Sequence, residues 1–313
     1  MRTVDILMVG PYPAWDMVDL EANYTVHKLW EVEDREALFA AAGLRIRAIA
    51  TRGELGARAD LMDRLPNLEI VSCYGVGTDA IDLGHARAKG IAVTNTPDVL
   101  TGDVADLGMG LLLATARCIP DGDRHVRSGD WAIGNLALTT RIHGKRVGIV
   151  GLGRIGSAFA RRAAAFDCEI AYFGRTPRTD SPYRFVGDLV ELAKQSDFLV
   201  VTLAGGEATK GLISAQVLAA LGPDGIFVNL SRGSTVDEGA LLTALENRVI
   251  KAAGLDVFQN EPRIDSRFAR LSNVVLQPHH GSGTVETRRA MGQLVRDNLA
   301  AHFARRALLT PVR

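Results

Sequence analysis

Short apolar runs rich in Val, Ile and Leu alternate with helix-forming segments along almost the whole chain. The runs that predict strands are residues 5–9, 46–51, 68–73, 91–94, 146–150, 170–173, 198–203, 226–230, 253–257 and 274–276. The helix-forming segments include residues 34–42, 81–89, 103–117, 157–166 and 285–303. Strands that are apolar on both sides and separated by helices are typical of a parallel sheet covered on both faces. The pattern therefore predicts an α/β protein.

A glycine-rich turn joins the predicted strand at residues 146–150 to the helix that follows it. Gly151, Gly153 and Gly156 have the G-x-G-x-x-G spacing. The first glycine permits a tight turn, the second lets the backbone approach a pyrophosphate, and the third lets helix and strand pack closely. Free N–H groups at the start of a helix attract phosphate charge. The predicted dinucleotide-binding residues are Gly151, Leu152, Gly153, Arg154, Ile155 and Gly156. The alternative is a tight turn that binds no ligand.

The predicted strand at residues 170–173 ends in a basic loop. An NAD-binding protein usually has Asp or Glu here, which holds the ribose hydroxyls. This chain has Gly174, Arg175, Thr176, Pro177 and Arg178 instead, with no acid before Asp180. Guanidinium groups can pair with the 2′-phosphate of NADP. The loop therefore favours NADP, with NAD still possible. The alternative is that both arginines are solvated loop charges.

Composition limits the class of protein. The 36 basic residues equal the 36 acidic ones, so no net charge favours nucleic acid or an acidic membrane. No apolar run approaches the length of a membrane span, and the first ten residues lack a signal-peptide pattern. Cys73, Cys118 and Cys168 match no zinc or disulfide pattern, so we expect no metal. With 313 residues, the chain is expected to be a two-domain cytoplasmic enzyme.

Three side chains that come shortly after predicted strands are candidates for chemistry, because ligands of doubly wound sheets bind beyond the carboxyl ends of strands. Arg232 could hold a carboxylate and a carbonyl oxygen, or form a structural ion pair. Glu261 could orient an imidazole, or be a surface charge. His279 is a candidate proton donor, and on residue type alone its neighbour His280 is equally eligible. A histidine pair could also serve only in packing.

A second glycine-containing turn follows the predicted strand at residues 68–73. It reads Tyr74-Gly75-Val76-Gly77-Thr78. Two glycines let backbone N–H groups face a small anion. The alternative is a plain turn between a strand and a helix.

Together these segments resemble the D-isomer-specific 2-hydroxyacid dehydrogenases across nearly the whole chain. The motifs that carry the resemblance are, in order, YGVGTDAID, GLGRIG, NLSRGSTVDE, GLDVFQNEP and PHHGSGT. The segments TNTPDVLTGDVADLGMGLLLA, GRTPR and HHGSGTVETR are similar, more narrowly, to the NADPH-dependent glyoxylate, hydroxypyruvate and hydroxyphenylpyruvate reductases. One departure is His280, where the family commonly has Ile or Val. Another is the turn at residues 203–209, which replaces a commoner proline-rich turn.

The resemblance implies two doubly wound parallel-sheet domains. A Rossmann cofactor domain, residues 99–284, would be inserted into a flavodoxin-like substrate domain, residues 1–98 and 285–313. The hinges would lie near Thr96-Pro97 and Gly281-Ser282. The family is usually homodimeric, so the resemblance also implies a second copy of the chain as partner.

The resemblance assigns roles to individual residues as well. Arg232 would bind the substrate carboxylate and polarise the carbonyl, His279 would protonate the new alkoxide, and Glu261 would pair with His279. Val76 and Gly77 would hold the carboxylate through backbone N–H groups. Beyond the glycine turn and the basic loop, the residues implied to contact the cofactor are Thr101, Val104, Leu203, Ala204, Ser231, Asp256, His279 and Gly281.

The function that the resemblance implies is reduction of a small 2-keto acid, hydroxypyruvate or glyoxylate, by NADPH to the D-2-hydroxy acid. One alternative is an aromatic or bulkier substrate such as hydroxyphenylpyruvate. A formate-type oxidation is disfavoured, because related enzymes of that type have Gln where this chain has Glu261. A non-catalytic dinucleotide sensor that binds partner proteins is a further alternative.

Overall fold

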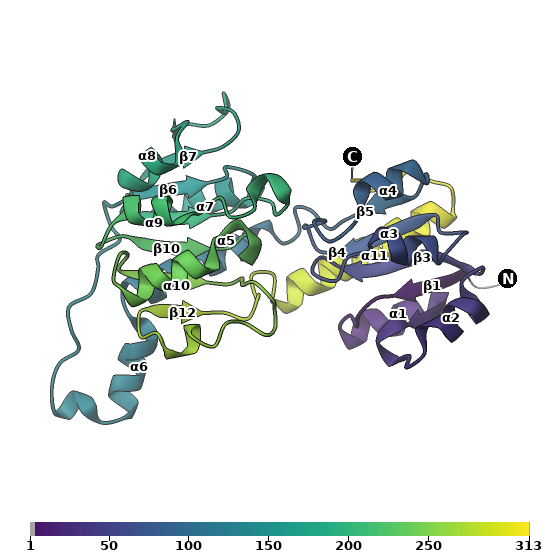
Figure 1. Cartoon of the computed structure of the whole chain (residues 1–313), viewed down its shortest axis with the longest axis horizontal. Coiled ribbons are helices and arrows are strands. Elements are labelled where there is room, and N and C mark those ends of the chain that lie inside the picture. Colours follow the sequence, from purple (N-terminus) through teal and green to yellow (C-terminus); the bar gives the residue numbers. More distant parts are fainter. Residues whose placement is uncertain (1–3, 313) are drawn as a thin grey trace. The chain divides into compact units, whose positions relative to one another are not determined.

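The computed structural model describes residues 4–312 of the chain. They form two compact units. Unit 2 is the continuous segment Thr101–Gly281, and unit 1 consists of the described residues on either side of it. Each unit contains one parallel sheet with helices on both of its faces (Figure 1). The predicted fold class, two doubly wound α/β units, is confirmed.

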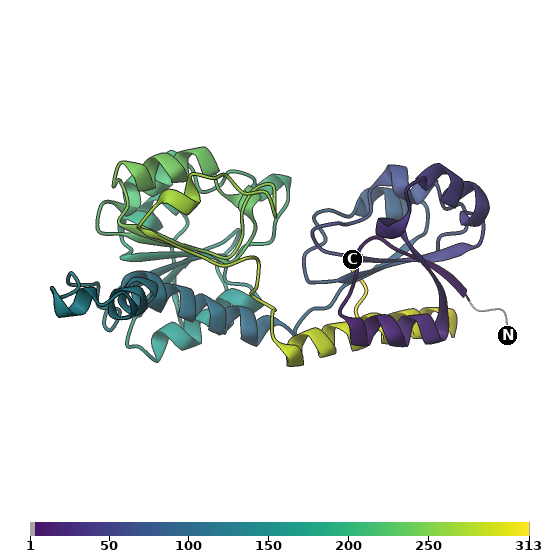
Figure 2. The same cartoon turned by 90° about the horizontal axis from the view of Figure 1, so that it is seen from below.

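Unit 1 has a five-stranded sheet in the order β2-β1-β3-β4-β5, with parallel neighbours throughout. Its strands are β1 (Val4–Met8), β2 (Tyr24–Lys28), β3 (Ile46–Arg52), β4 (Ile70–Tyr74) and β5 (Ala92–Thr94). Its helices are α1 (Ala14–Asn23), α2 (Arg35–Ala42), α3 (Ala59–Asp63), α4 (Leu83–Ala88) and α11 (Val285–Phe303). Helices α1 and α11 cover one face of the sheet, while α2, α3 and α4 cover the other (Figure 2). This strand order is flavodoxin-like.

Unit 2 has a seven-stranded parallel sheet in the order β12-β11-β10-β9-β6-β7-β8. Its strands are β6 (Arg146–Val150), β7 (Glu169–Phe173), β8 (Arg184–Phe185), β9 (Phe198–Val201), β10 (Ile226–Asn229), β11 (Ala252–Leu255) and β12 (Val274–Leu276). Its helices are α5 (Thr101–Ala116), α6 (Ile119–Arg127), α7 (Arg154–Ala164), α8 (Leu189–Lys194), α9 (Ala215–Leu221) and α10 (Glu238–Glu246). The chain reverses direction across the sheet at β6, which lies between β7 and β9. That is the strand order of a Rossmann sheet with one added strand, β12.

The helices of unit 2 form two layers. Helices α8, α9 and α10 share a buried apolar core with one face of the sheet. Helices α5 and α7 pack together on the opposite face (Figure 2). Large side chains that are almost fully buried, such as Phe198, Phe227 and Tyr172, fill the space around the strands. Both faces of the sheet are therefore covered, as its apolar strands require.

All ten predicted strands form, and each end lies within two residues of its predicted position. Two strands were missed. One is β2, an edge strand that is only half-buried and contains polar residues. The other is β8, which has two residues. The helix after the glycine turn begins earlier than predicted, at Arg154, because Gly153 is its N-cap.

Short polar side chains define where five of the helices begin. The side chains of Asp34, Asp82, Asp188, Asp237 and Thr284 each accept a backbone N–H from the first turn of the helix that follows. Such caps satisfy N–H groups that have no partner within the helix. The helix starts are therefore set locally by the sequence.

Within residues 4–312, no helix combines the length and apolar character needed to cross a bilayer. The same residues contain no group of three or more His, Cys, Asp or Glu side chains arranged to hold a metal ion. Cys73, Cys118 and Cys168 are free thiols, and two of them are buried.

Candidate active site

The glycine turn connects β6 to α7 at the point where strand order reverses. Gly151 has a φ of +99°, and a Cβ on Gly156 would lie only 2.1 Å from the carbonyl oxygen of Gly151. A Cβ on Gly153, by contrast, would meet no heavy atom within 4 Å. No side chain caps the first turn of α7. The open space at Gly153 and the uncapped helix start fit the pyrophosphate of a dinucleotide.

The two arginines of the basic loop after β7 differ in their hydrogen-bond partners. The guanidinium of Arg178 donates to both carboxylate oxygens of Asp180, at 2.9 and 2.6 Å, and to the carbonyl of Leu152, at 2.8 Å. Arg175 is exposed, and within residues 4–312 it has no hydrogen-bond or ion-pair partner. Gly174 and Thr176 flank it. Arg175 is thus the cation of this loop whose charge is not matched by a protein carboxylate.

The other predicted cofactor residues fall into two groups within unit 2. The hydroxyl of Ser231 donates to the carbonyl of Leu203, at 2.6 Å, and the carbonyl of Ala204 accepts the Thr209 hydroxyl. In the second group, Gly281 packs against Val104 and the carboxylate of Asp256. Thr101 is the first residue of α5, the helix that carries Val104.

His279 and Glu261 are in direct contact. Nδ1 of His279 lies 2.6 Å from Oε2 of Glu261, and the other carboxylate oxygen accepts the backbone N–H of Phe258 at 2.7 Å. Burial raises the pKa of Glu261, but the hydrogen bond and charge of His279, the Phe258 N–H and the charge of Arg232 outweigh it, so the pKa is lowered. Glu261 therefore remains a carboxylate into acidic solution, where it continues to hold Nδ1 of His279.

Arg232 follows β10 and is partly buried. One of its terminal nitrogens donates to the carbonyl of Ser231 at 2.8 Å. Its charge also contributes to lowering the pKa of Glu261, so the two side chains lie within electrostatic reach. The structure thus brings Arg232, Glu261 and His279 into one region of unit 2.

Asp256 holds the turn that carries His279. Its carboxylate accepts the backbone N–H groups of His280, at 2.6 Å, and Gly281, at 2.9 Å, and its carbonyl accepts the N–H of His279. His279 has a left-handed backbone with a φ of +53°, which is uncommon for a non-glycine residue. Burial raises the pKa of Asp256, and the two N–H donors act against that shift. Sequence reasoning placed Asp256 near the cofactor but missed this support for the histidine turn.

The predicted carboxylate-binding turn lies in unit 1, directly after β4. The carbonyl of Val76 accepts the side-chain amide of Asn95, at 2.8 Å, and the carbonyl of Gly77 accepts the thiol of Cys73, at 3.5 Å. Val76 is exposed. The turn is therefore anchored through its carbonyl oxygens.

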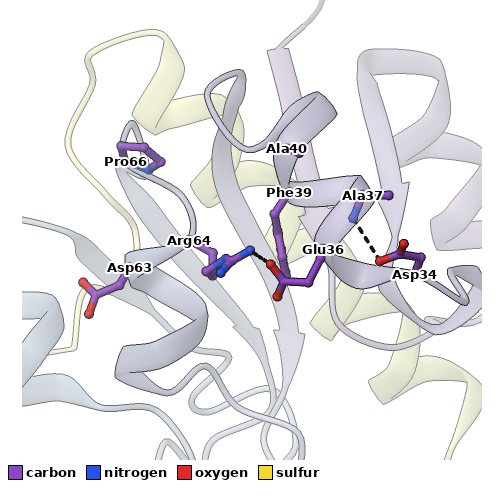
Figure 3. A pocket seen from close by; sticks show the side chains of 8 residues that line it. All are labelled: Asp34, Glu36, Ala37, Phe39, Ala40, Asp63, Arg64 and Pro66. Carbon is purple, nitrogen blue, oxygen red and sulfur yellow. Dashed lines mark hydrogen bonds and ion pairs between the residues drawn. The ribbon is translucent and has the colours of Figure 1, made fainter.

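A surface hollow in unit 1 contains none of the predicted site residues. It lies between α2 and α3, and its lining includes three acids and Arg64. Arg64 is paired with Glu36, and Asp34 caps α2 (Figure 3). Asp63, the third acid, is paired with His85 and Lys89. The charged groups of the hollow are therefore engaged, and the chemistry indicated by the sequence lies elsewhere.

The chain is similar to known proteins over its whole length. A family model described as the NAD binding domain of D-isomer specific 2-hydroxyacid dehydrogenases matches residues 109–281. The chain is 47% identical to glyoxylate/hydroxypyruvate reductase A of Arabidopsis thaliana, over 100% of both chains. It is also 47% identical to hydroxyphenylpyruvate reductase of Plectranthus scutellarioides, again over 100% of both chains.

A solved structure is similar over the same length. It is the NADPH-dependent glyoxylate/hydroxypyruvate reductase of Sinorhizobium meliloti in complex with NADP and malonate. The two sequences are 44% identical, the TM-score is 0.93, and the match covers 100% of this chain and 97% of that one.

Two glycine substitutions test the dinucleotide turn. Gly153→Ala adds a methyl group in open space, so the melting temperature should stay unchanged. The methyl would, however, occupy the path of a pyrophosphate, and NADPH should bind at least about tenfold more weakly, or ~1.4 kcal/mol. Gly156→Ala forces the methyl against the Gly151 carbonyl and should lower stability by about 1–3 kcal/mol. Calorimetric titration and thermal unfolding measure both effects. Unchanged NADPH affinity in Gly153→Ala would show that the dinucleotide binds elsewhere.

Proposed function

The chain belongs to the D-isomer-specific 2-hydroxyacid dehydrogenases, a family of oxidoreductases, and from this premise we propose that it reduces a small 2-keto acid with NADPH. Hydroxypyruvate and glyoxylate are the proposed substrates, and the product is the D-2-hydroxy acid. The observation that carries the proposal is the 2.6 Å contact between His279 and Glu261, in the same unit as the dinucleotide turn and within electrostatic reach of Arg232.

His279 is the proposed proton donor. Its Nδ1 is held by Glu261, which leaves Nε2 to face the substrate oxygen. The carboxylate of Glu261 orients the ring, and the ring gives a proton to the new alkoxide. In the reverse direction the neutral ring accepts the hydroxyl proton. Bound NADPH supplies the hydride for the carbonyl carbon.

Arg232 is proposed to bind the substrate carboxylate and to polarise the C2 carbonyl. A guanidinium offers parallel N–H donors that match two oxygens at once, and it keeps its charge at all relevant pH values. As negative charge develops on the carbonyl oxygen, this fixed positive charge stabilises it. A role of the Val76 and Gly77 backbone N–H groups in binding a carboxylate stays a prediction from the sequence.

The preference for NADPH is proposed from the basic loop. Arg175 is exposed and has no partner among the residues that the structure describes, so its guanidinium is available to a 2′-phosphate. Arg178 is already neutralised by Asp180 and must exchange that partner to contribute. The Sinorhizobium meliloti relative, which is described as NADPH-dependent, supports the same cofactor.

A bulkier keto acid is the second proposed substrate class. It is supported by the hydroxyphenylpyruvate reductase of Plectranthus scutellarioides, which is as similar to this chain as the Arabidopsis thaliana reductase. Steady-state kinetics on hydroxypyruvate, glyoxylate and hydroxyphenylpyruvate, each with NADPH and NADH, tests both proposals. The substrate with the highest kcat/KM defines the class.

We propose that the active form is a homodimer. Helix α6 and the segment after it project from the body of unit 2 (Figure 1). This segment carries exposed apolar side chains, namely Ile119, Val126, Trp131, Ile133 and Leu138. A concentration of exposed apolar side chains marks an interaction surface, and a second copy of the chain is the proposed occupant. A cytoplasmic location stays a prediction.

The first prediction from this function concerns the Glu261–His279 pair. His279→Asn should bind NADPH normally but lose about 10²–10⁴-fold in kcat, because no proton donor remains. Glu261→Gln should reduce kcat less, because the ring of His279 remains but loses the carboxylate that orients it. In wild type, the Glu261–His279 contact loses its carboxylate only when Glu261 takes up a proton as the pH falls. Because the pKa of Glu261 is lowered, this protonation occurs below the usual pH range for Glu. Unchanged turnover in His279→Asn would show that His279 is not the proton donor.

The second prediction concerns cofactor choice. Arg175→Ala should lower kcat/KM for NADPH by about 10–100-fold, the value of one charge-assisted hydrogen bond, and leave kcat/KM for NADH nearly unchanged. Arg178→Ala should have a smaller effect, because Asp180 already holds that guanidinium. Initial rates at several cofactor concentrations provide the comparison. If wild type uses NADH about tenfold better than NADPH, the basic-loop argument is wrong.

The third prediction concerns assembly. Wild type should have twice the 33.6 kDa mass of the chain in light scattering. The double substitution Trp131→Ser and Ile133→Ser should shift the mass toward the monomer, because it removes two large exposed apolar groups. Val18→Ser, which changes an exposed apolar residue of unit 1, is the matched control and should remain dimeric. A monomeric wild type contradicts the proposal.

A further inference from the structure

Glu238 lies behind the Glu261–His279 pair, and the proposed function gives it no role. It is the first residue of α10, whose N-cap is Asp237, with a side chain that accepts the N–H of Ala240. The carboxylate of Glu238 leaves its helix and accepts the backbone N–H of Gln259 at 2.8 Å. The side chain therefore holds a different segment of the chain and is not needed as the cap of α10.

The segment that Glu238 holds carries Glu261. Gln259 precedes Glu261 by two residues, and its side-chain amide donates to the carbonyl of Val236 at 3.1 Å. Asn260, between them, has a left-handed backbone with a φ of +57°. One oxygen of Glu261 is bound back to the N–H of Phe258, which leaves the other for His279. The direction of the carboxylate thus depends on the conformation of this short loop.

The loop rests directly on the turn that follows Arg232. A Cβ on Gly233 would lie 1.9 Å from the carbonyl carbon of Phe258, so the two backbones are in close contact. Phe258 itself is buried and packs edge-on against Phe268 at a ring distance of 5.6 Å. Packing therefore fixes Phe258 at the start of the loop, and the Glu238 carboxylate holds the next residue, Gln259.

The charges around Glu238 connect it to the same pair. Burial raises the pKa of Glu238, the nearby Asp265 and Glu261 raise it further, and the Gln259 N–H and Arg267 lower it. Glu238 therefore affects Glu261 in two ways, through the loop and through charge. The substitution Glu238→Gln distinguishes these two effects, because an amide oxygen can still accept the Gln259 N–H but carries no charge.

We propose that Glu238 is a positioning residue that keeps the Glu261 carboxylate aligned on His279 by holding the N–H of Gln259. The inference rests on the proposed roles of Glu261 and His279. It assigns Glu238 no contact with substrate or cofactor.

Kinetics of Glu238 variants, alone and combined with Glu261→Gln, test the proposal. Glu238→Ala should lower kcat for keto-acid reduction by about tenfold and leave KM for NADPH within about twofold. The reason is that the substitution misplaces only the Glu261–His279 pair. Glu238→Gln should restore most of the lost kcat. Glu246→Ala, at the exposed far end of α10, is the matched control and should leave the activity unchanged.

The double variant makes the test specific. If Glu238 acts through Glu261, Glu238→Ala should cost no more than about twofold in the Glu261→Gln background. Glu238→Met keeps the side-chain length but cannot accept the hydrogen bond, and it replaces Glu238→Ala if that variant fails to fold. The proposal is overturned if Glu238→Ala behaves like wild type, or if it costs the same factor in both backgrounds. If Glu261→Gln itself keeps the wild-type rate and pH profile, the proposed role of Glu261 is wrong, and the inference falls with it.

Discussion

The parallel direction of every strand in the sheet of unit 2 is the constraint on which the site depends. Because the strands are parallel, all their carboxyl ends lie at one edge of the sheet. The glycine turn follows β6, the basic loop follows β7, and Arg232, Asp256 and His279 follow β10, β11 and β12. An antiparallel strand at any of these places would send its following loop to the opposite edge.

At that edge, hydrogen bonds between loops determine where the reactive groups point. The buried Asp256 carboxylate is costly to desolvate, and two backbone N–H donors on the histidine turn offset the cost. Glu261 is similarly satisfied on both oxygens, by Phe258 and by His279. The contacts of Asp256 with the histidine turn and of Glu261 with His279 join residues 18 to 25 positions apart in the sequence. The geometry of the pair is therefore set by several loops at this edge together.

Much of the fold and part of the site followed from the sequence. Apolar runs located ten strands, because strands buried on both faces have an uninterrupted apolar pattern. The half-exposed edge strand β2 and the two-residue β8 have no such pattern and were missed. The glycine spacing located the turn between β6 and α7, and the family resemblance pointed to the pairing of Glu261 with His279, which lie 2.6 Å apart. Nothing in the sequence distinguished Arg175 from Arg178. The structure distinguishes them, because Asp180 binds the guanidinium of Arg178.

The sequence by itself determined the α/β class, the helix caps, the glycine turn and the residue types available for chemistry, because each depends on short-range periodicity or on the local conformation of a few residues. The tertiary structure alone decided which of those residues meet. Asp256 supports the turn of His279, and Glu238 holds the loop of Glu261, through contacts between separate strand ends. Such contacts depend on the order of strands in the sheet, and strand order is set by long-range packing that no local pattern encodes.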